Sequence, residues 1–245
     1  MIAIVGTNHD DILYFENVIS NKREEMIFKK YKVTIGNIYN QEVLLMHGLN
    51  TSILSSAICT NIFSKYFVDL IIVVGRCFAL GEKSAVGDII ISDKVVNIDV
   101  DQIDDNDVRI GQIPTLPQEF KVQNDVIGYI EDGLNKRAFT TGKRVTILTS
   151  NDLSNNTLRR MRENAVEIFD LDKVMVDSIS GGVAVASYLQ NIPFVAVKVV
   201  EKVVGQKWDV ENYLKVLDSY VNADKAIIAT IGDIGRSDVI IGGHH

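Results

Sequence analysis

VDLIIVVGRCFALGEKSAVGDIIISD, from Val68 to Asp93, holds two apolar segments of strand length. Asp69–Val74 is a nearly continuous apolar run, which is typical of a strand buried on both faces of a sheet. A turn is expected at Gly75, and Gly87–Val96 then predicts a second strand that opens at a Val-Gly-Asp turn. Buried strands of this kind alternate with helical segments along the chain, which predicts an α/β protein with a mixed, largely parallel sheet between helical layers.

The same alternation extends to both ends of the chain. Further strands are predicted at Ile2–Val5, Tyr31–Ile38, Glu42–Met46, Val145–Thr149, Lys173–Asp177 and from Phe194 onward. Helices are predicted after Thr7 or Asn8, over Thr51–Phe63, Asp125–Leu134, Asn155–Asn164, Ser180–Leu189 and Val210–Ile231. Asp99–Glu119 is polar and is expected to cross the surface. We expect one domain over residues 1–240, with residues 241–245 a remnant of a purification tag.

Composition and charge exclude several classes of protein. The chain has 245 residues, is 47% hydrophobic and carries a formal net charge of −7, which argues against a nucleic-acid partner. No apolar stretch approaches the length of a membrane span, and no signal peptide is recognised. Two cysteines without a Cys-x-x-Cys motif favour a reducing cytoplasm. The histidines lack metal-ligand spacing, so no metal or other cofactor is expected.

Four stretches occur together in one order: IAIVGTNHDD near the start, the segment from Val68 to Asp93, GQIP at 111–114 and NIPFVAV at 191–197. This set resembles the nucleoside phosphorylase/nucleosidase family, and most closely its 5′-methylthioadenosine/S-adenosylhomocysteine nucleosidases. The resemblance implies a three-layer α/β/α sandwich around a twisted mixed sheet. It also implies hydrolysis of the N-glycosidic bond of a purine nucleoside, without a cofactor, in a homodimer.

The homodimer has some support in the residues themselves. The helix from Thr51 to Phe63 has more apolar surface than one sheet face requires, and a core helix in a monomer is the alternative. The residues expected at a two-fold interface are Ala57, Ile58, Ile62 and Phe63.

Cleavage of a purine nucleoside needs a general acid for the leaving base, a carboxylate that activates water and a carboxylate that holds the ribose hydroxyls. The resemblance places Asp11 at the water-activating position, where the family usually has the longer glutamate. A structural alternative is that Asp10 and Asp11 complement a helix N-terminus.

Two further positions depart from the family pattern. Gly75 matches the glycine of the sugar-binding turn, but bulky Arg76, Cys77 and Phe78 follow it in place of small residues. Arg76 is expected either to bind an anion or to pair with a neighbouring acid such as Asp11 or Asp177.

The ribose-binding slot falls on Asp177, Ser178 and Ile179 when residues are counted back from Pro193. Isoleucine cannot accept a hydrogen bond from a hydroxyl group. A rival alignment places Asp170, Leu171 and Asp172 in the slot, at the cost of an insertion.

The strand that begins at Phe194 reads FVAVKVVEKVVG and ends on two charges. The family carries Ser-Asp where this chain has Glu201-Lys202, so Lys202 stands at the general-acid position. A shift of one residue would substitute Glu201, but strand alternation would turn it to the opposite face. The resemblance places the base-binding loop, typically Ser-Gly-Asp-Ala-Phe in the family, at residues 149–153, which read Thr-Ser-Asn-Asp-Leu here. Asp152 is therefore a candidate for contact with the base, and Leu153 replaces a stacking aromatic residue.

Leu49 is expected to form an apolar wall near the 5′ substituent. Two functions remain open from the sequence. One is a nucleosidase whose activity is weak or lost, and the other is a non-catalytic relative that binds a nucleoside, a nucleotide or another anion.

Overall fold

The computed structural model describes residues 1–100, 111–138, 141–165 and 169–234. Its strands are β1 (Ile2–Val5), β2 (Ser20–Ile27), β3 (Tyr31–Ile38), β4 (Gln41–Met46), β5 (Leu70–Ala79), β6 (Ile89–Asn97), β7 (Phe120–Lys121), β8 (Lys143–Thr149), β9 (Val174–Asp177) and β10 (Phe194–Val203). Its α-helices are α1 (Leu13–Val18), α2 (Ser52–Lys65), α3 (Asn124–Gly133), α4 (Asn155–Ala165), α5 (Ser180–Gln190) and α6 (Val210–Ile234). Short helical segments are η1 (His9–Asp11), η2 (Leu134–Ala138) and η3 (Leu171–Lys173).

The ten strands form one mixed sheet in the order β10-β6-β8-β9-β5-β1-β4-β3-β2, with β7 paired to β6. β5 is long enough to pair with β10 in parallel along its whole length and with β9 in antiparallel fashion near its end. Because β10 also pairs with β6, the strands β10, β6, β8, β9 and β5 close into a barrel-like ring. The sequence did not predict this closure, which brings the ends of β5, β9 and β10 together.

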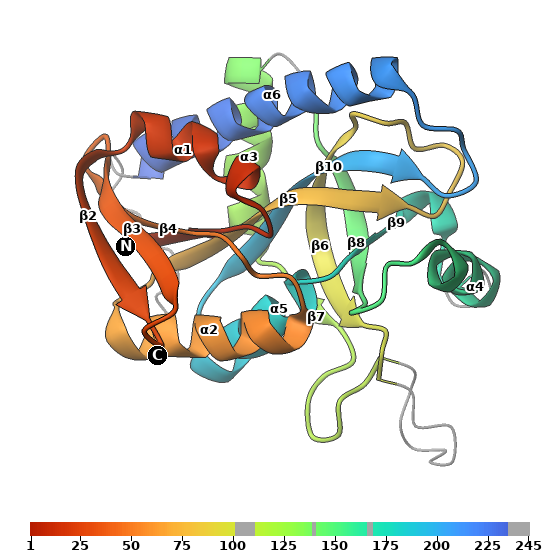
Figure 1. The fold of residues 1–245 in the computed structure, drawn as a ribbon, viewed down its shortest axis with the longest axis horizontal. Helices are drawn as coiled ribbons and strands as arrows, with labels where there is room; N and C mark the ends of the chain where they lie inside the picture. The colour runs from red at the N-terminus through yellow and green to blue at the C-terminus, as the bar shows by residue number, and fades with distance from the viewer. Residues whose placement is uncertain (101–110, 139–140, 166–168, 235–245) are drawn as a thin grey trace.

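Helices cover both faces of the sheet, as Figure 1 shows: α1, α3 and α6 lie on one side, and α2 and α5 lie on the other. The buried apolar side chains of most strands and of these helices form one continuous core. A smaller cluster lies beneath α4 and includes Leu80, Val96, Leu148 and Leu158. The predicted three-layer α/β/α sandwich is therefore confirmed.

Helices α2 and α5 approach each other closely at Gly182, where an added Cβ atom would lie 1.9 Å from the carbonyl oxygen of Ser52. On α2, Ile58 and Ile62 are fully buried within the core of this chain. The prediction that these two side chains contribute to a subunit interface is therefore wrong.

One strand was missed from the sequence, and one predicted turn is wrong. The segment Ser20–Ile27 is a strand, paired antiparallel to β3, that the sequence analysis did not identify. Seven of its eight residues are exposed, so it lacks the alternation of a half-buried strand and carries the charges typical of a sheet edge. Gly75 does not begin a turn, since β5 continues through it to Ala79.

Candidate functional site

Asp11 lies at the end of β1, in the short helix η1, and is almost fully buried. Its Oδ2 atom accepts hydrogen bonds from the backbone N–H groups of Thr7 (2.9 Å) and Asn8 (2.8 Å), and its Oδ1 atom accepts one from the hydroxyl group of Tyr220 (3.3 Å). Gly75 passes beside this carboxylate with a φ of 118°, and an added Cβ atom there would lie 2.8 Å from Oδ2. The strand ends therefore hold a fixed carboxylate against a backbone position that only glycine fits.

Asp177, the last residue of β9, forms a buried ion pair with Lys198 of β10, with Nζ 2.8 Å from Oδ2. The Asp177 side chain is 2% exposed and that of Lys198 is 1% exposed. The carboxylate also accepts hydrogen bonds from the hydroxyl groups of Thr149 (2.9 Å) and Ser180 (2.5 Å) and from the Ser180 N–H group. Every oxygen of Asp177 is thus engaged by the protein itself.

Arg76 pairs with Glu201 across β5 and β10, with Nη1 2.9 Å from Oε1, and not with Asp11 or Asp177 as the sequence analysis expected. Glu201 lies two residues after Val199, the residue of β10 that pairs with Arg76, so strand alternation places both charges on one face of the sheet. The register of β10 also shifts between Val200 and Lys202, which leaves Glu201 as the extra residue of a β-bulge. Lys202 instead donates to Oδ1 of Asn155 on α4 at 3.0 Å. The two adjacent charges at the end of β10 therefore serve different partners.

The loop at residues 149–153, expected to contact the base, is fixed by hydrogen bonds to neighbouring parts of the protein. The Ser150 hydroxyl group and the Asn151 amide donate to the carboxylate of Asp99. Asp152 accepts from the N–H group of Ser154 and from the hydroxyl group of Thr157, and these bonds, the Thr157 bond foremost, lower the pKa of Asp152. Asp152 thus acts as a local anchor at the start of α4.

The remaining predicted site residues are mostly internal. Leu49 and Ile179 are fully buried in the main core, and Cys77 is buried so completely that the pKa of its thiol rises above the ordinary value. Phe78 and Leu153 are partly buried against the smaller cluster. Ser178 follows directly after Asp177 at the end of β9.

The rival ribose segment lies at the other end of β9. Asp170 caps the short helix η3 before the strand, and Asp172 lies within that helix and pairs with Lys83 at 2.7 Å. Asp177, rather than either of these, is therefore the acidic residue at the carboxyl end of β9.

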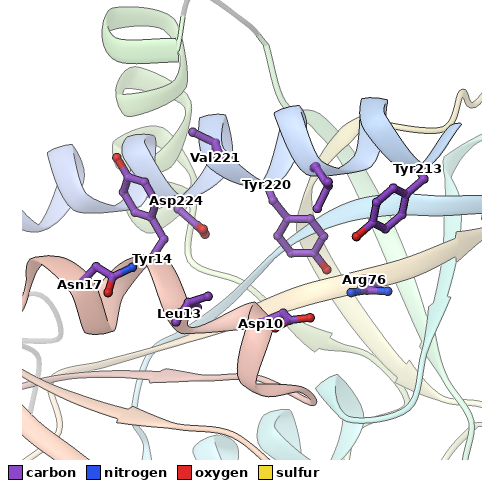
Figure 2. A pocket seen from close by; sticks show the side chains of 10 residues that line it. Asp10, Leu13, Tyr14, Asn17, Arg76, Tyr213, Tyr220, Val221 and Asp224 are labelled. Carbon is purple, nitrogen blue, oxygen red and sulfur yellow. The ribbon is translucent and has the colours of Figure 1, made fainter. Parts of the chain in front are cut away.

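A cavity of about 480 Å³ opens beside Asp11, between α1 and α6. Figure 2 shows ten side chains that line it: Asp10, Leu13, Tyr14, Asn17, Arg76, Tyr213, Leu217, Tyr220, Val221 and Asp224. Arg76 is the one predicted substrate-binding residue among them. The sequence analysis did not identify Tyr220 or Asp224.

Two further searches cover the described residues alone. In that part of the chain, no three His, Cys, Asp or Glu side chains gather as a metal site would require. No helix there combines the length and the apolar character that crossing a bilayer would demand.

The sequence profile of the phosphorylase superfamily matches residues 2–231. The chain belongs to the phosphorylase superfamily. Its curated relatives include the 5′-methylthioadenosine/S-adenosylhomocysteine nucleosidase of Staphylococcus haemolyticus, which is 23% identical over 231 residues, or 94% of this chain and 98% of the relative. The nucleosidase of Bacillus subtilis is 23% identical over 206 residues, which cover 84% of this chain and 87% of that protein.

Solved structures agree on the fold. A putative nucleosidase from Borrelia burgdorferi bound to adenine superposes with a TM-score of 0.82 at 23% identity and covers 96% of this chain and 100% of its own. The nucleosidase from Neisseria meningitidis in complex with methylthio-immucillin-A also has a TM-score of 0.82, at 17% identity, and covers 95% of this chain and 99% of its own.

Within this phosphorylase-superfamily chain, Lys198 is the clearest residue that the sequence analysis passed over. A lysine in the middle of an apolar strand needs a buried anion, and Asp177 already stood among the candidates. Asp224 offered a comparable signal, because it lies one helical turn after Tyr220 among the apolar residues of α6.

Proposed function

We propose that this protein binds a purine nucleoside of the methylthioadenosine or S-adenosylhomocysteine type at the ends of β1, β5, β9 and β10, and hydrolyses its N-glycosidic bond slowly. The observation that carries the proposal is the buried carboxylate of Asp11, fixed by two backbone N–H groups beside Gly75. A carboxylate held in this way is positioned to accept a proton from an attacking water molecule. The names of the full-length relatives support the same reaction.

Slow turnover is expected because two other groups are replaced. Lys202 stands where the family has its general acid, and an ammonium group can donate a hydrogen bond to the leaving base but is a weak acid at neutral pH. Ile179 stands where the family has the ribose-binding carboxylate, and its side chain offers no acceptor for a hydroxyl group. Loss of a general acid alone lowers a rate by about 10²–10⁴-fold.

The experiment is a coupled assay of adenine release from methylthioadenosine and S-adenosylhomocysteine with the purified protein. We expect turnover far below the ordinary enzyme value of about 10 per second, and its complete loss in Asp11→Asn. A rate in the ordinary range would refute the slow reaction. Calorimetry with the same nucleosides measures binding separately, and the absence of binding would refute the proposed substrate class.

The second candidate is a non-catalytic relative that binds a nucleotide or another anion. It is favoured by the three cations Arg76, Lys198 and Lys202 near the strand ends. The contacts oppose it, because Glu201 and Asp177 already neutralise the first two. Binding of a nucleoside monophosphate without any adenine release would favour this candidate over the nucleosidase.

We also propose a single domain over residues 1–240, a homodimer and a cytoplasmic location. Two large apolar side chains support a further contact surface, because Ile53 in the first turn of α2 is 76% exposed and Phe67, just after the helix, is 96% exposed. Cys59 and Cys77 are free and buried, which fits a reducing compartment. Light scattering that returned the monomer mass at micromolar concentration would refute the stable dimer.

A further inference from the structure

The cavity between α1 and α6 adjoins the proposed nucleoside site at Arg76 and at Tyr220, which donates to Asp11, and extends away from it along the two helices. Its walls come from η1, α1 and α6, with Arg76 of β5 at one end (Figure 2). Asp177, Ile179 and Lys202 do not line it. Its volume of about 480 Å³ lies within the range of small-molecule sites.

Asp224 is the unusual group in this cavity. The residue is 4% exposed, yet its carboxyl group has no hydrogen bond or ion pair within the described part of the chain. Burial, and after it the nearby carboxylate of Asp11, raises the pKa of Asp224 to about 8. The group is therefore largely uncharged at neutral pH, and it lacks a partner that a buried polar group normally has.

An uncharged carboxyl group offers an O–H donor and a C=O acceptor side by side. The edge of a planar heteroaromatic ring with a ring nitrogen beside an amino group presents the complementary acceptor and donor. The rings of Tyr14, Tyr213 and Tyr220 supply flat apolar surfaces in the same cavity, against which such a ring can pack.

Arg76 lies at the other end of the cavity with 30% of its side chain exposed, and its guanidinium group lies 5.8 Å from the centre of the Tyr220 ring. Its charge is already paired with Glu201, so it creates no strong demand for an anionic ligand. The uncharged carboxyl group of Asp224 gives an organic ammonium ion no counter-ion, which favours an uncharged ligand beside it.

We infer that the cavity between α1 and α6 binds an uncharged, planar, amino-substituted heteroaromatic ring of the nucleobase class, which pairs with the carboxyl group of Asp224. This site goes beyond the proposed function, since it neither contains the strand-end residues Asp177 and Lys202 nor requires turnover.

Calorimetric titration with adenine tests the inference, with 6-dimethylaminopurine as the matched ligand that cannot donate from its amino group. At pH 6.5 we expect adenine to bind the wild-type protein and the dimethyl compound to bind about tenfold more weakly, the equivalent of about one hydrogen bond. Asp224→Ala should weaken adenine binding by a similar factor or more. Asp218→Asn changes an exposed acid on the same helix and should leave binding unchanged.

Raising the pH separates pairing by Asp224 from simple filling of the cavity. From pH 6.5 to pH 9 wild-type affinity should fall about tenfold, because Asp224 loses its donor proton. Asp224→Asn keeps a donor and an acceptor and should bind equally well at both values. The other charged or titratable groups around the cavity are Asp10, Asp11, Tyr14, Arg76, Glu201, Tyr213 and Tyr220, and the asparagine variant retains all of them.

Four outcomes would overturn the inference. In the first, adenine does not bind the wild-type protein. In the second and third, adenine binds equally well to Asp224→Ala, or the dimethyl compound binds as tightly as adenine. In the fourth, a simple alkylamine binds and its affinity rises with pH. Adenine binding that is lost in Lys202→Ala but kept in Asp224→Ala would place the ring at the strand ends. That result would overturn this inference while it supported the proposed function.

Discussion

Replacement of Lys198 by methionine isolates the buried ion pair that joins β9 to β10. Methionine retains most of the volume of the side chain, so the change removes the charge and leaves little empty space. Asp177 would then remain as a buried carboxylate with no cation at 2.8 Å. Removal of one partner of a buried pair typically costs about 3–5 kcal/mol.

The structure favours the lower end of that range. Asp177 keeps the hydrogen bonds from Thr149 and from Ser180, and these donors stabilise the carboxylate after the lysine is lost. We therefore expect the free energy of unfolding to fall by about 3 kcal/mol. With a urea dependence of about 3 kcal/mol per molar, the midpoint of unfolding should fall by about 1 M.

Urea unfolding followed by circular dichroism at pH 7 measures this loss. Lys202→Met is the matched control, because that lysine lies on the same strand and makes one exposed hydrogen bond, to Asn155. It should cost less than about 1 kcal/mol. The double variant Lys198→Met/Asp177→Asn should regain part of the loss, since the buried charge is absent. A loss for Lys198→Met no larger than for Lys202→Met would refute the stabilising role of the pair.

Three further changes have expected outcomes in stability assays. Gly75→Ala should lower the free energy of unfolding by about 2 kcal/mol or more, because φ is 118° and the new methyl group would press on the Asp11 carboxylate. Gly128→Ala in α3 is the control, because it has open space and should stabilise the protein by up to about 1 kcal/mol. Thermal unfolding compares the two variants. Asp224→Asn should become more stable relative to wild type as the pH rises from about 4 to about 8. Over that window the folded wild-type protein retains a proton that the unfolded chain, with an ordinary pKa of 3.8, has lost, and urea unfolding at several pH values checks the sign. Arg76→Ala should lower the free energy of unfolding by about 1 kcal/mol, because the half-buried pair with Glu201 is lost. Phosphate should leave the melting temperature of the wild-type protein unchanged, since Arg76 already has a partner. Differential scanning fluorimetry measures both effects.

The fold was largely predictable because its buried strands appear in the sequence as continuous runs of apolar residues. The run at Asp69–Val74 falls within β5 except for Asp69, and Val145–Thr149 falls within β8. β2 was missed for the opposite reason, since an exposed edge strand buries almost nothing and leaves no periodic signal. The closure of β10 onto both β5 and β6 depends on pairing between distant segments, which local patterns do not record.

The candidate site was predictable in position but not in its contacts. Asp11, Asp177 and Lys202 do lie at strand ends, as the sequence indicated. The choice of ion-pair partners was not predictable, because it depends on the register of β10 against β5, which the sequence does not show. Asp224 was passed over although it lies among apolar residues of α6, because the apolar pattern of that long helix explained the segment without it.

These contacts suggest why the departures from the family pattern occur together. A strand-end site that binds a ligand must leave polar groups unsatisfied until the ligand arrives, and such groups are costly when buried. Here Arg76 of β5 pairs with Glu201 of β10, and Asp177 of β9 pairs with Lys198 of β10. Each pair lies between strands that the ring brings together, so the charges that could have met a substrate stabilise the closure of the sheet. Asp11 takes no part in either ion pair, and it is the carboxylate on which any remaining hydrolysis would depend.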